Sequence, residues 1–354
     1  MTSRGRFWFW LVGGLVLVLA AVAAFAPVPF VARSPGPVFD LLGEVEGEPV
    51  LEVTGTTTYT ADGVMDLTTV SEYGGSGGSI TSGLAVLGWL SSTTTVLPDE
   101  DRGDAQAREF EEAVFDASLS TAQAAAANYL DRPVTSVPVV VSVALDTPAE
   151  GVLQATDEIV GIDGKSVGNS QQVAKRIQSQ PPGTEFQLII VRDGEESEVT
   201  VASESATDEN GDEVARVGIV VENVYSSDFE VALNLDGIGG PSAGLMLAVA
   251  IIDKLTPQDL VAGRHIAGTG TISSEGDVGE IGGIAKKMIS AREDGAELFL
   301  APVGNCDEVV GQIPDGLAVA AVETLDQAMK AITEWRAGKS VADCPSGSPS
   351  AERR

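Results

Sequence analysis

The feature that most constrains the fold is a strand, a glycine-rich turn and a buried helix in direct succession near the middle of the chain. Residues Phe229–Leu235 alternate apolar and polar side chains, as half-buried strands do, and Ala243–Leu255 is almost entirely apolar. Pro241 suits the first position of a helix, which places Ser242 in the first turn. Free N–H groups and the positive end of the helix dipole would stabilise a negatively charged oxygen there. The turn itself reads Gly237-Ile238-Gly239-Gly240-Pro241-Ser242-Ala243-Gly244.

A serine hydroxyl at its ordinary pKa is a poor nucleophile, so a catalytic role for Ser242 requires a base nearby. The only histidine of the chain is His265, which lies at the edge of a second apolar strand, where a structural role is the more frequent one. A lysine can act as the base when burial or a positive field lowers its pKa enough to leave free amine at neutral pH.

Two neighbouring lysines lie in a segment that is typical of a turn followed by a helix, Gly282–Arg292. With about 100° per residue, Lys287 lies on one apolar stripe with Ile284 and Met288. Lys286 lies on the opposite face. Burial and the helix dipole would both lower the pKa of the inward lysine. A lysine on such a stripe can also extend its amine to solvent, and spacing alone does not separate these two roles.

Three segments carry the candidate site residues: Gly240-Pro241-Ser242-Ala243-Gly244, the pair Thr269-Gly270, and Gly282-Gly283-Ile284-Ala285-Lys286-Lys287. Together they resemble the proteolytic domain of Lon-type serine proteases, a family with a serine–lysine dyad, in which the third segment reads Gly-Gly-Leu-x-x-Lys. The resemblance implies Ser242 as the nucleophile, Lys287 as the base and Thr269 as the residue that orients the lysine. It also implies that main-chain N–H groups of the loop around Gly240, Pro241 and Ala243 hold the oxyanion.

Two positions depart from the family pattern. A glycine, Gly240 or its neighbour, replaces the aspartate that the family usually has before Gly-Pro-Ser. Thr271 replaces the glutamate that follows Thr-Gly in the family. The first change concerns how the nucleophile loop is held, and it leaves both dyad residues in place.

The stretch Asp157–Lys165 reads Asp-Glu-Ile-Val-Gly-Ile-Asp-Gly-Lys and follows Thr156. It is similar to the signature Gly-Asp-x-Ile-x-x-Ile-x-Gly of PDZ domains, with Thr156 in place of the first glycine, and residues 131–205 resemble a PDZ domain. The resemblance implies a β-sandwich-like module with two helices, at Thr147–Leu153 and Gln171–Gln178, and a closing hairpin around Asp193-Gly194. PDZ domains bind peptides by adding a strand to a sheet edge. The sequence has no clear Gly-Leu-Gly-Phe loop, so a role in spacing or gating the catalytic domain stays open.

The N-terminal stretch Phe7–Ala26 has no charged residue, and as a helix it would span about 30 Å, the thickness of a bilayer core. Arg4 and Arg6 precede it, which favours a cytoplasmic N-terminus and an exported remainder. The alternative is a signal-peptide cleavage site before Pro27, but the apolar run is long and a proline after the cut is unfavourable. We therefore expect an uncleaved, single-pass anchor in the cell membrane with the bulk of the chain extracytoplasmic.

The chain carries 52 acidic and 21 basic residues, which argues against nucleic acid as a partner because duplex binding needs a basic surface. Cys306 and Cys344 are the only cysteines and are candidates for a disulfide in an exported chain. No Cys/His cluster has zinc spacing, and the sequence has no Gly-x-x-x-x-Gly-Lys-Ser/Thr phosphate loop. We therefore expect no metal, no cofactor and no use of ATP.

These observations predict an α/β (α+β) Lon-type proteolytic domain with an inserted PDZ domain and one N-terminal transmembrane helix. Before the PDZ domain we expect short strands up to Val70, an apolar stretch at Leu84–Leu90 and a long helix at Asp104–Leu130. The expected segments are a short cytoplasmic end (1–6), the anchor (7–27), the N-terminal part of the Lon-like domain (28–130), the PDZ domain (131–205), the Lon-like core (206–337) and a polar, frayed tail (338–354).

The expected function is an ATP-independent serine endopeptidase that cleaves peptides or unfolded, exported proteins. Two alternatives stay open: a non-catalytic, membrane-anchored PDZ adaptor, against which the intact Ser242 and Lys287 argue, and a protein that processes only itself. A dinucleotide-binding fold is rejected because the third glycine after Gly237-Ile238-Gly239 is misplaced. Lon-type domains commonly form rings, so the resemblance also implies a homo-oligomer.

Overall fold

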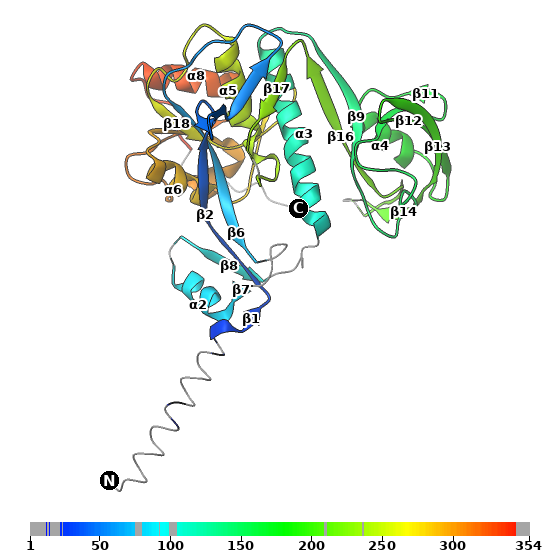
Figure 1. The fold of residues 1–354 in the computed structure, drawn as a ribbon, viewed down its shortest axis with the longest axis horizontal. Coiled ribbons are helices and arrows are strands. Elements are labelled where there is room, and N and C mark those ends of the chain that lie inside the picture. Colours follow the sequence, from blue (N-terminus) through cyan, green and yellow to red (C-terminus); the bar gives the residue numbers. More distant parts are fainter. Residues whose placement is uncertain are drawn as a thin grey trace.

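A computed structural model describes residues 12, 14, 22, 24–74, 80–91, 93–98, 105–208, 211–235 and 237–344. They form a larger α/β unit and a smaller, β-rich unit on either side of the long helix α3 (Ala105–Tyr129) (Figure 1). Within this described part, no helix is both long and apolar enough to cross a bilayer. The anchor expected at 7–27 falls largely outside the described residues, as does the tail from 345 onward.

The larger unit is built on a six-stranded sheet. The order across the sheet is β22 (Ala318–Val322), β21 (Leu298–Pro302), β18 (His265–Gly268), β6 (Val64–Tyr73), β2 (Phe30–Asp40) and β8 (Thr95–Pro98). The first four strands run parallel, β2 runs antiparallel to β6, and β8 runs antiparallel to β2. Strands β22, β21 and β18 are short and mostly apolar, as parallel strands covered on both faces are, whereas β6 is ten residues long and mixes apolar with polar residues.

Helices cover both faces of this sheet, and alternate residues of one strand serve the two sides. On β21, Leu298 and Leu300 belong to one core cluster, whereas Phe299 belongs to another. The first cluster contains α5 (Gly244–Leu255), α3 and α8 (Leu325–Arg336), and the second contains α6 (Ile284–Asp294) and the short α7 (Cys306–Val309). Helix α5 is buried along its first ten residues, which explains its almost wholly apolar sequence.

Short elements complete the larger unit. They comprise the helix α2 (Ser82–Leu90), the 3-10 helices η2 (Pro241–Ala243) and η3 (Val303–Asn305), and the pairs β1 (Pro27–Val28) with β7 (Ile80–Thr81), β3 (Glu44–Val45) with β4 (Glu48–Pro49), β5 (Leu51–Thr54) with β17 (Glu230–Leu233), and β19 (Thr271–Ile272) with β20 (Val278–Gly279).

The smaller unit is a sheet covered by one helix, α4 (Ser170–Gln178), around its own core of buried apolar side chains. The turn formed by Asp193 and Gly194 has a positive φ at both residues, as the expected Asp-Gly hairpin requires. The order of the strands is β13 (Glu195–Ala202), β12 (Glu185–Arg192), β10 (Glu158–Ile162), β9 (Val134–Val143) and β16 (Ile219–Ser227), with β11 (Lys165–Ser166) paired to β10.

The sheet of the smaller unit continues beyond residue 205, where the sequence analysis ended it. The hairpin of β14 (Glu204–Thr207) and β15 (Glu213–Arg216) leads the chain back, and β16 then pairs with β9 over its whole length. Residues 218–221 thus do not return directly to the larger unit as expected, because Ile219 and Val221 pack on the smaller core. The segment Thr147–Leu153, expected as a first helix, forms hydrogen-bonded turns.

Helix α3 connects the two units through side chains on one of its faces. The Ser120 hydroxyl accepts a hydrogen bond from the Tyr225 N–H at 2.6 Å and donates one to the Tyr225 carbonyl at 3.3 Å. Gln123 donates from Nε2 to the Phe229 carbonyl at 2.7 Å. The outer edge of β16 is therefore capped near its end by a helix of the larger unit.

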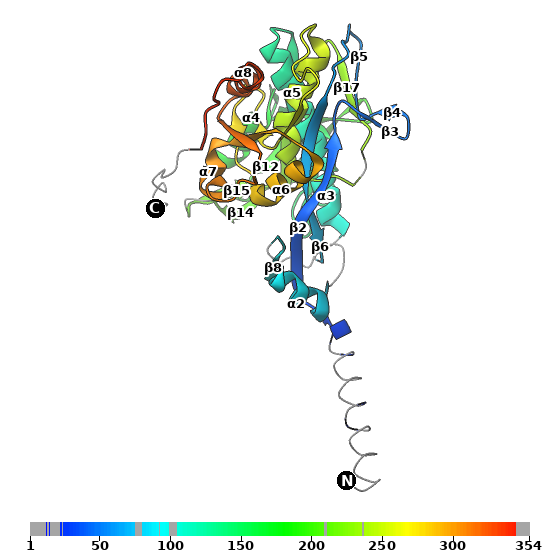
Figure 2. The ribbon, with the colours of Figure 1, turned by 90° about the vertical axis from the view of Figure 1, so that its left-hand side faces the viewer.

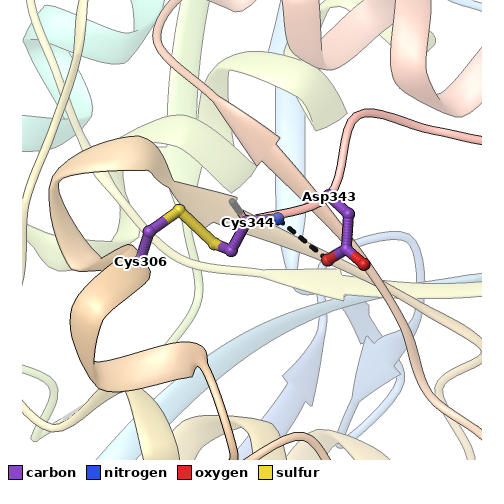
Figure 3. Close-up of a disulfide and its surroundings, with 3 residues drawn as sticks. All are labelled: Cys306, Asp343 and Cys344. Carbon is purple, nitrogen blue, oxygen red and sulfur yellow. Dashed lines mark hydrogen bonds between the residues drawn. A yellow bond between two sulfur atoms is a disulfide. The ribbon is translucent and has the colours of Figure 1, made fainter. Parts of the chain in front are cut away.

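The C-terminal segment is held to the larger unit by a disulfide between Cys306 and Cys344, whose Cα atoms lie 5.2 Å apart (Figure 3). The Ala321 N–H of β22 also donates to the Ala342 carbonyl at 2.8 Å. The polar segment expected to fray from Gly338 onward is thus attached as far as Cys344. The link between the two cysteines was left undecided by the sequence because pairing depends on a distance that only the fold supplies.

Candidate active site

The serine singled out by the sequence lies in η2, between the glycine-rich turn and the buried helix α5. Gly240, the residue before η2, has a φ of 80°, a conformation that favours glycine, and Pro241 occupies the first helical position as predicted. The Ser242 hydroxyl oxygen lies 2.7 Å from the Nζ atom of Lys287. The strand–turn–helix pattern therefore brings a hydroxyl to the start of a helix, where one amine contacts it.

Lys287 comes from the first turns of α6, which starts after Gly283. Its side chain is only 3% exposed, and its amine donates to Ser242 Oγ and, at 2.9 Å, to Thr269 Oγ1. The neighbouring Lys286 turns away and donates to Thr95 Oγ1 at 2.7 Å. The inward direction of Lys287 is the one that the helical spacing predicts.

Thr269 connects the lysine to the loop of Ser242. Its hydroxyl accepts from Lys287 and donates to the Ser242 carbonyl at 3.0 Å, and its residue is 1% exposed. The same carbonyl also accepts from the Gly270 N–H at 3.0 Å, while the Leu245 N–H donates to the Gly270 carbonyl. Ser242, Lys287 and Thr269 thus form one connected group, so that neither the hydroxyl nor the amine is free to move independently.

Burial changes the acid–base behaviour of Lys287. Desolvation disfavours the ammonium form and lowers the pKa of Lys287 from 10.5 to about 8. None of the ion pairs in the described part of the chain involves this lysine, so no carboxylate opposes the shift. At neutral pH a measurable fraction of the amine is therefore unprotonated and can accept a proton.

A pocket of about 430 Å³ opens in front of the serine and lysine. Its walls come from β2, from the second half of β6, from the loop 237–243 and from Gly282. Strand β18 pairs with β6 only as far as Leu67, and in the described part of the chain no strand covers that edge of β6 further on. The pocket therefore contains an open sheet edge next to Ser242, and backbone N–H and C=O groups are available along such an edge.

One residue of the site was missed by the sequence analysis. Ser118 of α3 is 7% exposed, and its hydroxyl donates to the Pro241 carbonyl at 3.2 Å. A Cβ on Gly244 would lie 3.2 Å from this hydroxyl oxygen and 2.9 Å from Ile272 Cγ2. The motif glycine, Gly244, thus allows α3 to approach the loop of Ser242, and no local pattern in the sequence connects Ser118 with a loop more than a hundred residues away.

His265 lies apart from Ser242 and contacts the buried Asp66 carboxylate through Nε2. Desolvation raises the pKa of Asp66 to about 6, while the bond to His265 opposes the rise. Asp294 at the end of α6 completes a group of three potential metal ligands whose donor atoms lie within 4.8 Å of one another. Cysteine and histidine spacing could not indicate this group, because its members come from three separate elements.

Comparison with known families agrees with this geometry. Residues 232–334 match the model of the Lon protease (S16) C-terminal proteolytic domain, and residues 124–202 match that of the PDZ domain. The chain combines a Lon-type proteolytic domain with a PDZ domain. The Lon-like match includes the loop of Ser242, the strand before Thr269 and the helix of Lys287. The PDZ match covers the smaller unit up to the end of β13.

Individual relatives match parts of the chain. Lon protease 2 of Bacillus subtilis is 33% identical over 109 residues, which are 30% of this chain and 19% of that protein. The Lon protease of Haemophilus influenzae is 37% identical over 93 residues, which are 25% of this chain and 11% of that protein. The crystal structure of the PDZ domain of an SdrC-like protein from Listeria innocua is 30% identical, with a TM-score of 0.22, over 24% of this chain and 92% of that chain. The chain thus spans less than a fifth of the two Lon proteases.

Thr156, which departs from the PDZ signature, adopts a φ of 75°. This is the left-handed region, in which glycine is favoured and a β-branched residue is rare. The conformation explains why the signature has glycine at this position. The threonine keeps the turn, since its N–H donates to the Val140 carbonyl at 2.8 Å.

Proposed function

We propose that the protein is a membrane-anchored serine endopeptidase that cleaves peptides or unfolded proteins without ATP, with Ser242 as nucleophile and Lys287 as base. The observation that carries the proposal is the 2.7 Å contact between the Ser242 hydroxyl and the Lys287 amine. This lysine is buried, no described carboxylate pairs with it, and its pKa is lowered to about 8. Burying a lysine amine costs stability whatever its role, and strongly perturbed pKa values gather at functional sites.

The proposed cycle moves one proton back and forth. Neutral Lys287 takes the Ser242 proton while Oγ attacks the scissile carbonyl, and main-chain N–H groups of the nucleophile loop hold the oxyanion. The lysine then gives the proton to the leaving amine, and the acyl-enzyme forms on Ser242. The same amine then takes a proton from a water molecule, whose oxygen attacks the ester carbonyl. The lysine returns this proton to Ser242 Oγ as the ester bond breaks, which releases the acid product and restores the serine. Thr269 keeps the amine directed at the hydroxyl through its two hydrogen bonds.

The open edge of β6 supports an extended peptide as substrate. A peptide lying beside residues 68–73 would add a strand where β18 ends, and its carbonyl groups would pass the Ser242 hydroxyl in the same pocket. Only a flexible or unfolded segment can adopt this conformation at a sheet edge. The sequence contains no phosphate loop, which supports activity without nucleotide and limits the substrates to segments that are already unfolded.

The PDZ domain offers a second edge for peptides. Strand β16 is the last strand of its sheet, and α4 lies next to it, with the Ser170 N–H donating to Asn223 Oδ1 at 2.7 Å. We propose that a peptide segment binds along β16 beside α4 and that α3, which contacts both β16 and the nucleophile loop, couples this binding to cleavage.

The membrane location and the oligomer belong to the same proposal. The uncharged stretch Phe7–Ala26 would cross the membrane once and leave the described domains outside the cytoplasm. The disulfide between Cys306 and Cys344 supports an oxidising compartment. A homo-oligomer follows only from the resemblance to Lon-type rings.

The proposal is tested by incubating the detergent-solubilised full chain with casein in the absence of nucleotide. We expect casein fragments, and a fluorophosphonate that reacts with activated serines should modify Ser242, as located by mass spectrometry of peptides. Intact casein together with an unmodified Ser242 would contradict the proposal and favour the adaptor. Fragments of the protein itself with intact casein would favour self-processing.

The pH dependence of cleavage should follow Lys287. Only the neutral amine can take the serine proton, so kcat/KM should rise with pH up to about 8 and then level off, falling about tenfold for each pH unit below that value. The profile is measured with an uncharged fluorogenic peptide, and far-UV circular dichroism at each pH confirms that the fold persists. A flat profile between about pH 6 and pH 9 would exclude this lysine as the base.

A further inference from the structure

Helix α2 presents its large apolar side chains outward and its small ones inward. Among its residues, Ala85 and Gly88 are buried, whereas Leu87 is 64% and Leu90 is 80% exposed. A surface helix of a water-soluble domain shows the opposite arrangement, with its large apolar side chains facing the core. The exposed set, called the α2 patch below, consists of Leu84, Val86, Leu87, Trp89 and Leu90.

Close packing against neighbouring strands determines that Ala85 and Gly88 of α2 face inward. A Cβ on Gly88 would lie 2.6 Å from Val96 Cγ2, so only glycine permits the observed approach of α2 to β8. Ala85 belongs to a small cluster with Ala32 and Ile80. A rotation of the helix that buried its leucines would break these contacts, so the outward direction of the patch is a property of the fold.

The α2 patch lies where the apolar N-terminal stretch ends. The Ser82 N–H donates to the Ala26 carbonyl at 2.8 Å, and a Cβ on Gly83 would lie 2.9 Å from the Ala24 carbonyl oxygen. In both views α2 lies at the tip of the long strands β2 and β6, away from α5 and α8 (Figures 1 and 2). Phe25, which is 77% exposed, extends the apolar surface on that side.

Charge separates this tip from the rest of the molecule. The chain has a net charge of −31, yet no charged residue occurs from Tyr73 to Pro98. The charges nearest to the tip on the long strands are Arg33 and Glu72, which pair with each other at 2.8 Å. A strongly anionic protein would be repelled by anionic headgroups, whereas an uncharged, leucine- and tryptophan-rich tip would not.

We propose that the α2 patch is seated in the interfacial layer of a lipid bilayer, beside the point where the chain enters the membrane. Trp89 suits this layer because its indole is apolar with one polar edge, and the apolar face of an interfacial helix reaches about 5–10 Å into the boundary between headgroups and acyl chains. The patch gives the chain a second attachment, which holds the tip of β2 and β6 against the membrane and sets the direction in which the pocket faces. This proposal rests on the membrane location proposed above but not on proteolysis.

The test uses the full chain reconstituted into phosphatidylcholine vesicles and isolated by flotation. An environment-sensitive fluorophore is attached at Leu87→Cys, with Leu145→Cys as the matched control, because Leu145 is a leucine of the smaller unit with nearly the same exposure, 63%. Spin-labelled lipids that carry the nitroxide near the headgroup should remove most of the fluorescence at position 87 and leave that at position 145 unchanged. Aqueous iodide should quench the fluorescence at position 145 and leave that at position 87 unchanged.

Other outcomes overturn the proposal in distinguishable ways. Equal quenching of both positions by iodide means that the patch faces water. If neither iodide nor the lipid quenchers reach position 87 and energy transfer occurs between labelled copies, a second copy of the chain covers the patch. A chain that stays with the buffer during flotation overturns the proposed anchor as well. Casein cleavage is measured on the same vesicles, so a failure of the protease proposal is seen separately.

Discussion

A chain with methionine at position 287 should lose proteolysis and gain stability. Removal of a general base typically costs about 10²–10⁴-fold in rate, and Lys287→Met leaves Ser242 without one. Burial also makes the native lysine costly, since a pKa lowered from 10.5 to about 8 corresponds to about 3 kcal/mol. Methionine has a similar shape and carries no charge, so the free energy of unfolding at neutral pH should rise by up to about 3 kcal/mol.

The stability gained by Lys287→Met should depend on pH. The unfolded lysine holds its proton up to about 10.5, whereas the folded one loses it near 8, so the cost is fully present below pH 8 and disappears as the pH rises towards 10.5. The stability advantage of Lys287→Met should therefore shrink across this window. Casein cleavage and urea unfolding are the two measurements, and the matched control is Lys286→Met, whose native amine reaches Thr95 instead. Cleavage retained by Lys287→Met would remove the lysine from the mechanism.

Replacing Arg192 by alanine should destabilise the PDZ domain by about 3 kcal/mol. Asp157 is fully buried, and Arg192 donates to its two carboxylate oxygens at 2.6 and 2.7 Å. Removing one partner of a buried pair leaves an uncompensated charge, which typically costs about 3–5 kcal/mol. The remaining bond from the Gln154 N–H to Asp157 keeps the expected loss at the lower end. Hydrogen exchange of the β10 and β12 amides in the full chain measures the opening of this domain alone.

The matched control for this prediction is Arg216→Ala. Arg216 contacts Glu204 at 3.9 Å and is 60% exposed, so its loss should change stability by less than about 1 kcal/mol. The Lon-like domain should retain its own protection in both variants, because its core cluster contains no residue of the PDZ cluster. Equal effects of the two substitutions would show that the buried pair contributes no more than a surface contact.

The sequence predicted the elements of the candidate site because each has a local signal. A proline before the serine marks a helix start, a glycine pair marks the turn before α6, and the 3.6-residue period selects Lys287 over Lys286 as the inward lysine. The long helix expected at 104–130 is α3, because its composition and length are sufficient to specify a helix. The membership of β16 in the PDZ sheet was not predictable in the same way, since its apolar alternation suits either sheet.

By itself, then, the sequence predicted most of the strands and helices, the residues proposed to carry the chemistry and the families that the chain resembles, but it was wrong at Thr147–Leu153, which forms turns. Only the tertiary structure decided which of these segments meet: the 2.7 Å contact of Ser242 with Lys287, the hydrogen bond from Ser118 to Pro241, the disulfide and the outward face of α2. The physical reason is that periodicity, caps and turn residues act over a few positions along the chain. Contacts between distant segments depend instead on strand register and on the burial of whole faces, which no short stretch of sequence specifies.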